Sequence, residues 1–142
     1  MTYPVKMSVT LRPVDDPEVL VGINSNLFPL KLNKTETIHF EFESADTCEL
    51  VVELVDKTDQ EAVVIESVSF FGIEDPKFAW AGIYEPKYPE PWATEQRDQG
   101  VVLKPHLGPH TYLGWNGKWT LTFTVPVFTW IHGVQNLGWI YD

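Results

Sequence analysis

Strict alternation of apolar and polar residues marks several segments of this chain. Over residues 5–12, Val5, Met7, Val9 and Leu11 alternate with Lys6, Ser8, Thr10 and Arg12. Successive side chains of a strand point to opposite faces, so this pattern predicts a half-buried β-strand. The same alternation predicts strands over 36–43, 48–55 and 119–125. Shorter or less regular apolar runs predict further strands at 19–23, 27–32, 62–73, 127–132 and 137–141.

The turns between these runs favour an antiparallel arrangement. Asn116-Gly117 is the strongest two-residue hairpin signal, because a type I′ turn needs positive φ at both central positions. It predicts that 112–115 pairs with 118–121. The long run 62–73 suits a strand that is buried on both faces or carries a bulge. No dozen-residue window has a helical apolar stripe, and only 93–99 could form a short turn of helix. We therefore expect a single all-β domain over 1–142, an antiparallel β-sandwich or jelly roll of about 8–9 strands.

The alternation fails between Glu74 and Thr111. This stretch, which we call the excursion (about 74–111), holds six of the eleven prolines and several aromatic residues. Long segments without regular structure are uncommon in compact domains and are usually functional or disordered. Disorder is disfavoured because the segment is rich in aromatic residues. We expect it to be ordered and to lie across one face or edge of the sandwich.

Composition and charge exclude several classes of function. The chain has 10 Lys and Arg against 20 Asp and Glu, and it has no basic run. It therefore lacks the positively charged surface that binds nucleic acid or anionic lipid. No apolar window is long enough to span a membrane, and the start beginning at Met1 lacks the pattern of a signal peptide. Cys48 is the only cysteine, and its place in the largely apolar run 47–55 predicts that it is a small buried residue. The expectation is a soluble protein, cytoplasmic or in another reducing environment.

The aromatic residues of the excursion are the first candidate site. Tyr and Trp offer broad, stiff faces with a polar handle, and proline fixes the backbone before anything binds. Sugar rings can stack on such faces while nearby carboxylates bind the hydroxyl groups. The sequence thus predicts a carbohydrate platform, although the same rings could instead cap the core. Its candidate residues are Phe78, Trp80, Tyr84, Tyr88, Trp92, Trp115, Glu85 and Glu90.

Metal binding and catalysis have weaker support. Loop carboxylates at Asp15, Asp16, Asp46, Glu74 and Asp75 could supply oxygens to Ca²⁺, but they show no EF-hand spacing. His106 and His110, with His39 or His132, could begin a zinc site, but no zinc motif is present. There is no nucleophile motif, and a glycosidase carboxylate pair would leave no sequence signature. We therefore expect no cofactor and no catalytic residue, and keep a metal-dependent or glycoside-active enzyme as a minor alternative.

Two functions remain. The first is a non-catalytic binding module for carbohydrate. The second is a structural or assembly protein, such as a viral or phage-type subunit, in which the same rings and the apolar C-terminus would be buried between copies in a homo-oligomer. The sequence expectation favours the first.

Overall fold

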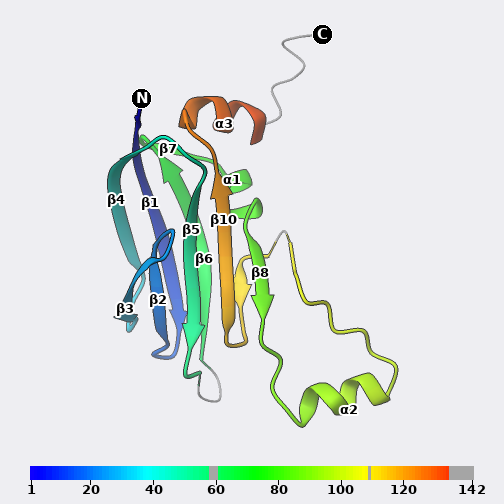
Figure 1. Ribbon diagram of the computed structural model, residues 1–142. Helices are drawn as coiled ribbons and strands as arrows, with labels where there is room; N and C mark the ends of the chain where they lie inside the picture. Colours follow the sequence, from blue (N-terminus) through cyan, green and yellow to red (C-terminus); the bar gives the residue numbers. More distant parts are fainter. Residues whose placement is uncertain (58–60, 109, 135–142) are drawn as a thin grey trace.

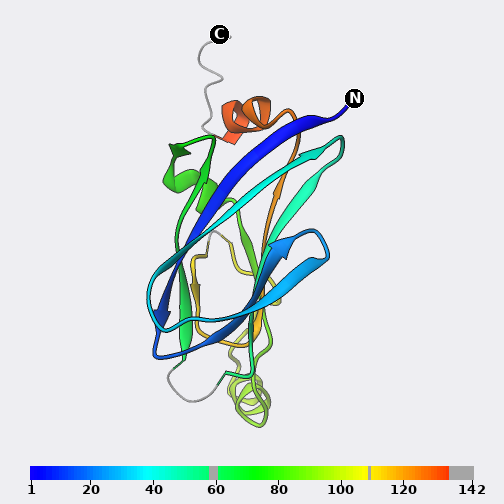
Figure 2. The same ribbon diagram turned by 90° about the vertical axis from the view of Figure 1, so that its left-hand side faces the viewer.

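Ten strands form two antiparallel sheets in the computed structural model, which describes residues 1–57, 61–108 and 110–134. This confirms the predicted β-sandwich, whose two layers are seen from two sides in Figures 1 and 2. The first sheet has the order β4 (Glu36–Ser44), β1 (Tyr3–Val14), β6 (Ala62–Phe70) and β7 (Ile73–Glu74), and β9 (Tyr112–Leu113) also pairs with β6. The second has the order β3 (Asn26–Lys31), β2 (Glu18–Ile23), β5 (Cys48–Val55), β10 (Gly117–Phe123) and β8 (Ile83–Pro86).

The alternating segments bury the faces that their patterns predict. Val5, Met7, Val9 and Leu11 of β1 are buried, and so are the inward residues of β5 and β10, including Cys48 and Trp119. Together they form one hydrophobic core between the sheets. On β4, which is an edge strand, the apolar residues are only partly buried. The jelly-roll connectivity stays a prediction.

The segment predicted as one strand over 62–73 is shorter than expected. β6 ends at Phe70, and Phe71 and Gly72 adopt positive φ values of 53° and 82°, which turn the chain back into β7. Of the two alternatives expected for this run, a strand buried on both faces or one with a bulge, the bulge is present: the register between β1 and β6 shifts between Thr10 and Leu11. Periodicity alone did not reveal the turn, because Phe71 looks like a strand residue.

The predicted Asn-Gly hairpin is wrong. β9 pairs with β6 of the first sheet, whereas β10 pairs with β5 and β8 of the second. Gly117 is already part of β10, opposite Leu54 and Pro86. The chain therefore crosses between sheets at 114–116. The Asn116 side chain accepts a hydrogen bond from the Lys57 backbone N–H (2.9 Å). The backbone carbonyl of Asn116 accepts one from the Lys87 backbone N–H (2.6 Å).

The strand predicted at 127–132 is also wrong, because the helix α3 (Val127–Val134) occupies these residues. Val127 and Ile131 are buried while Phe128 is exposed, and a spacing of four is helical. A six-residue apolar run is too short to tell the two periods apart. The strand predicted at 137–141 lies outside the described residues.

The excursion is ordered and contains regular elements. α1 (Pro76–Trp80) packs against β6, β8 adds an edge strand to the second sheet, and α2 (Trp92–Asp98) includes most of the helical turn expected at 93–99. α2 and α3 lie at opposite ends of the sandwich (Figures 1 and 2). No helix of the described residues is long and apolar enough to cross a membrane.

Candidate functional site

The structure divides the predicted platform into three parts. Phe78 and Tyr84 are fully buried in the core, so neither can offer its ring to a ligand. Trp80, on α1, is 54% exposed. It lines one hollow of the surface and Tyr88 lines another. A platform made from all the predicted rings therefore does not form. The remaining three rings, of Tyr88, Trp92 and Trp115, contact one another.

We call these three rings the ring cluster. The centroids of Trp92 and Trp115 are 4.9 Å apart, and Tyr88 lies 6.2 Å from Trp92 and 6.3 Å from Trp115. These separations are within the range of favourable aromatic pairs. All three side chains are partly buried. Tyr88 follows β8, Trp92 begins α2 and Trp115 precedes β10, so the cluster joins the segment 88–92 to the distant residue Trp115.

The buried Tyr84 hydroxyl holds the Trp115 segment. It donates a hydrogen bond to the Trp115 carbonyl and accepts one from the Trp115 N–H (3.0 Å). Burial raises the pKa of Tyr84 to about 12; the bond to the Trp115 backbone lowers the pKa and the neighbouring Tyr88 raises it. The hydroxyl therefore keeps its proton at neutral pH. Its role is to position Trp115, not to contact a ligand.

Close packing of backbone holds β8 against β10. A Cβ on Gly117 would lie 2.5 Å from the Glu85 carbonyl oxygen, and one on Gly82 would lie 2.1 Å from the Trp119 indole. The Trp119 indole N–H donates to the His110 carbonyl (3.0 Å), and the His110 ring stacks on Tyr84. The glycines thus let the start of the excursion approach the core closely.

Tyr88 and Glu90 make hydrogen bonds that hold the second half of the excursion, which follows β8 and spans 87–111. The Tyr88 hydroxyl donates to the Lys104 carbonyl (2.7 Å), which fixes the segment after α2. Glu90 accepts hydrogen bonds from the Thr94 N–H (3.0 Å) and hydroxyl, so this predicted ligand residue is occupied at the start of α2. Free N–H groups at a helix start are commonly satisfied by such side chains.

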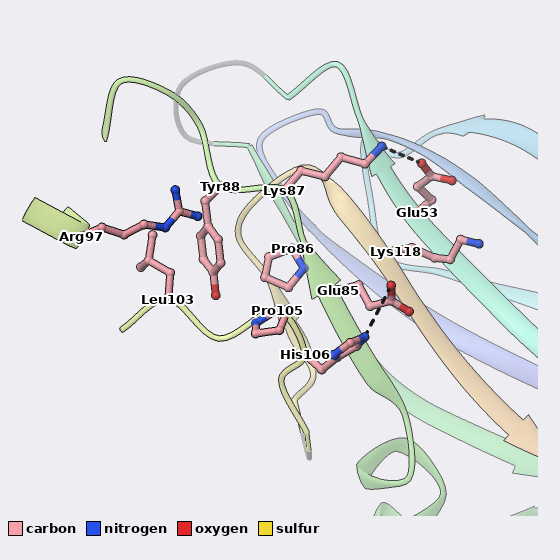
Figure 3. Close-up of a pocket in the computed structure, with 10 residues that line it drawn as sticks. All are labelled: Glu53, Glu85, Pro86, Lys87, Tyr88, Arg97, Leu103, Pro105, His106 and Lys118. Atoms are coloured by element: carbon pink, nitrogen blue, oxygen red, sulfur yellow. Dashed lines mark ion pairs between the residues drawn. The ribbon is translucent and has the colours of Figure 1, made fainter. Parts of the chain in front are cut away.

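Beside the ring cluster is a hollow of about 470 Å³, which we call hollow 1 (Figure 3). At its surface Lys87 forms an ion pair with Glu53 (3.8 Å), and His106 Nε2 lies 3.8 Å from a Glu85 carboxylate oxygen. Donors and acceptors therefore stand beside the Tyr88 ring. Its lining residues are Glu53, Glu85, Pro86, Lys87, Tyr88, Arg97, Leu103, Pro105, His106 and Lys118.

The sequence did not place Glu53, Arg97 or Lys118 in a site. Glu53 and Lys118 are directly opposite each other on β5 and β10, and Lys118 is opposite Glu85 of β8. Alternation indicates that Glu53 and Lys118 point outward from their strands. It does not indicate which strands are neighbours, because pairing between distant segments leaves no local signal.

Trp115 lines a different hollow, of about 430 Å³. This hollow is also lined by Lys57, Glu61, His110 and the exposed Tyr112. Hollow 1 and this hollow share no lining residue. The two can therefore be tested separately.

The candidate metal ligands do not assemble. Within 1–57, 61–108 and 110–134, no three His, Cys, Asp or Glu residues lie close enough to hold a metal ion. His106 lies beside Glu85, His110 stacks on Tyr84, and the Asp75 side chain accepts from the Lys77 N–H at the start of α1 (2.9 Å).

No protein-family model matches this chain, and no curated protein matches it by sequence. Among solved structures, the chain is similar to vCBM60 in complex with galactobiose, with a TM-score of 0.54 and 13% sequence identity. The match covers 82% of this chain and 96% of the other. That likeness is one of fold: the chain shares its β-sandwich architecture with a carbohydrate-binding module.

Proposed function

We propose that this protein is a non-catalytic carbohydrate-binding module that binds its sugar in hollow 1, against the Tyr88 ring. The observation that carries the proposal is the ring cluster beside a hollow lined with charged side chains. Ligand sites are typically concave, with aromatic surface and a few placed polar groups. Hollow 1 combines these features at the edge of the second sheet.

The chemistry of a sugar suits this surface. A pyranose has a face of C–H groups that packs on an aromatic ring, and each of its hydroxyls both donates and accepts hydrogen bonds. Carboxylates of Glu53 and Glu85 can accept from hydroxyls, while Lys118 and Arg97 can donate to them. Hydrogen bonds to charged groups are the stronger ones, which favours these side chains for holding a ligand.

The structural neighbour supports the proposal at the level of fold. It is a carbohydrate-binding module with a bound galactose disaccharide. Fold alone does not establish function, since one fold hosts many functions. The neighbour's ligand therefore serves as the first probe to try, not as an assignment.

Titration of the protein with galactobiose and a panel of neutral oligosaccharides tests the proposal. We expect binding by calorimetry, together with a change in tryptophan emission because Tyr88 contacts Trp92 and Trp115. Tyr88→Ala should weaken binding at least about tenfold, the equivalent of about 1.4 kcal/mol. Tyr88→Phe keeps the ring and should retain most of the affinity.

Tyr112→Ala is the matched control. Tyr112 is 50% exposed and lines the separate hollow beside Trp115, so its removal should leave affinity unchanged. Failure of every oligosaccharide to bind would reject the proposal, and so would full affinity in a folded Tyr88→Ala protein. Release of reducing sugar from the oligosaccharides would contradict its non-catalytic part.

A further inference from the structure

Hollow 1 adjoins a second hollow on the outer face of the second sheet. This hollow, of about 540 Å³, is also lined by Glu53 and Lys118, so the two hollows share one wall. We call it hollow 2. Each has a volume within the ~300–1,000 Å³ range of small-molecule sites, so together they have room for more than one sugar residue. The other residues of hollow 2 are Asn24, Ser25, Leu27, Glu49, Val51 and Thr120.

The strand register shows the course of the joint groove. Lys118 of β10 is opposite Glu53 on one side and Glu85 on the other, and Thr120 is opposite Val51. The groove therefore crosses β5, β10 and β8, which lie side by side (Figure 1). It begins near the turn between β2 and β3, at Asn24 and Ser25, and ends at the segment 103–106 that faces Tyr88 in Figure 3.

The charges along this groove are balanced. The whole chain carries 20 acidic against 10 basic residues. The groove, by contrast, has three carboxylates and three permanently cationic side chains. They are Glu49, Glu53 and Glu85 against Lys87, Arg97 and Lys118. A chain of uncharged sugars needs both acceptors and donors, whereas a polyanion would need an excess of cations.

We infer that the groove binds an internal run of an uncharged polysaccharide chain laid across β5, β10 and β8, with one part in hollow 1 and another in hollow 2. This inference rests on the proposed function. It adds that the ligand is an extended neutral polymer and not a single terminal sugar. Leu27, which is partly buried, gives hollow 2 apolar surface for C–H groups, and Thr120, Ser25 and Asn24 give it uncharged hydrogen-bonding groups.

A length series of galactose oligosaccharides, from disaccharide to hexasaccharide, tests the inference by calorimetry. We expect the hexasaccharide to bind at least tenfold more tightly than the disaccharide, because only the longer chain reaches both hollows. If the disaccharide binds and the hexasaccharide gains less than tenfold, the inference fails and the proposed function stands. If no member of the series binds, the proposed function fails for galactose polymers and the inference fails with it.

A blocking variant shows whether hollow 2 provides the gain. Thr120→Arg places a large side chain in hollow 2 and should reduce hexasaccharide affinity at least tenfold, far more than disaccharide affinity. Thr37→Arg, on β4 of the other sheet, adds the same side chain away from the groove and should leave the length dependence intact. An unchanged length dependence in folded Thr120→Arg would overturn the inference.

Oxidation of the C6 hydroxyls to carboxylates tests the preference for a neutral chain. We expect the oxidised hexasaccharide to bind at least tenfold more weakly than its parent, because the groove has no excess of cationic side chains to offset the added negative charge and the chain as a whole is acidic. Tighter binding of the oxidised chain would show that Lys87, Arg97 and Lys118 dominate. That result would overturn the neutral part of the inference.

Discussion

The two halves of the excursion, 74–86 up to the end of β8 and 87–111 after it, use the same kinds of residue in opposite ways. In the first half, Phe78 of α1 and Tyr84 of β8 are fully buried and belong to the core. In the second half, Tyr88 and Trp92 are only partly buried, and α2 buries Ala93 alone. The first half packs on a sheet, whereas α2 extends beyond the sandwich (Figures 1 and 2). Aromatic residues in a proline-rich segment thus join the core only where their segment packs on a sheet and their side chain faces that sheet.

The largest expected effect separates Phe78 from Trp80, which lie two positions apart on α1. Phe78 packs edge-on against Phe70 (5.4 Å between centroids) and contacts Trp130. Phe78→Ala should lower the free energy of unfolding by about 3–5 kcal/mol. Trp80→Ala, at an exposed site, should change it by no more than about 0.5 kcal/mol. Urea unfolding measures both, and similar losses would erase the distinction between core and surface rings.

Gly117→Ala tests the attachment of β8 to β10. The new Cβ would lie 2.5 Å from the Glu85 carbonyl oxygen, so the strands must separate or shift. We expect a loss of about 2–3 kcal/mol. Gly133→Ala is the control, because nothing lies within 4 Å of its Cβ position and alanine favours the helix by up to about 1 kcal/mol. Equal stability of the two variants would contradict the close approach.

Tyr84→Phe removes the hydroxyl that holds the Trp115 backbone. Leaving the part-buried N–H and C=O of Trp115 without this partner should cost about 1–2 kcal/mol. The change should also alter tryptophan emission from the ring cluster. A variant with wild-type stability and emission would show that the first half of the excursion does not support the second.

The same variant should change the alkaline stability of the protein. In the unfolded chain Tyr84 loses its proton near pH 10, but in the folded protein only near pH 12. Between these values the folded state binds more protons than the unfolded state, so the free energy of unfolding falls as pH rises. The stability that the raised pKa of Tyr84 contributes is fully present below pH 10 and is lost as pH rises through 12. Denaturant titrations from pH 8 to 12 should show a smaller loss in Tyr84→Phe than in the wild type.

The smallest expected effect concerns the second half of the excursion. Tyr88→Phe removes the hydrogen bond to the Lys104 carbonyl at an exposed position and should cost less than about 1 kcal/mol. Its consequence should be local, as faster hydrogen exchange of amides near 102–106. Uniformly faster exchange across the sandwich would mean that the second half is coupled to the core as strongly as the first.

Alternation predicted most of the sandwich because the buried and exposed faces of each half-buried strand appear in that strand's own sequence. It failed where contacts with distant segments determine the local structure. Trp115-Asn116-Gly117 looks like a hairpin, yet the strands before and after it belong to different sheets. Val127 to Val134 looks like a strand over its first six residues, yet it folds as a helix at the end of the core.

The candidate site shows the same limit. The sequence indicated Tyr88, Trp92, Trp115 and Glu85 by composition; in the structure Tyr88 and Glu85 line hollow 1, and the rings of Trp92 and Trp115 contact Tyr88. It gave no reason to connect them with Glu53 or Lys118. These side chains join the groove only because β5, β10 and β8 are neighbours.

The sequence by itself determined the inward faces of β1, β5 and β10 and hence an all-β protein, because burial with period 2 is a property of each strand alone. Only the tertiary structure decided which rings of the excursion are buried and where hollow 1 and hollow 2 lie. Both depend on which distant strands pair, and that pairing follows from the joint packing of the two sheets.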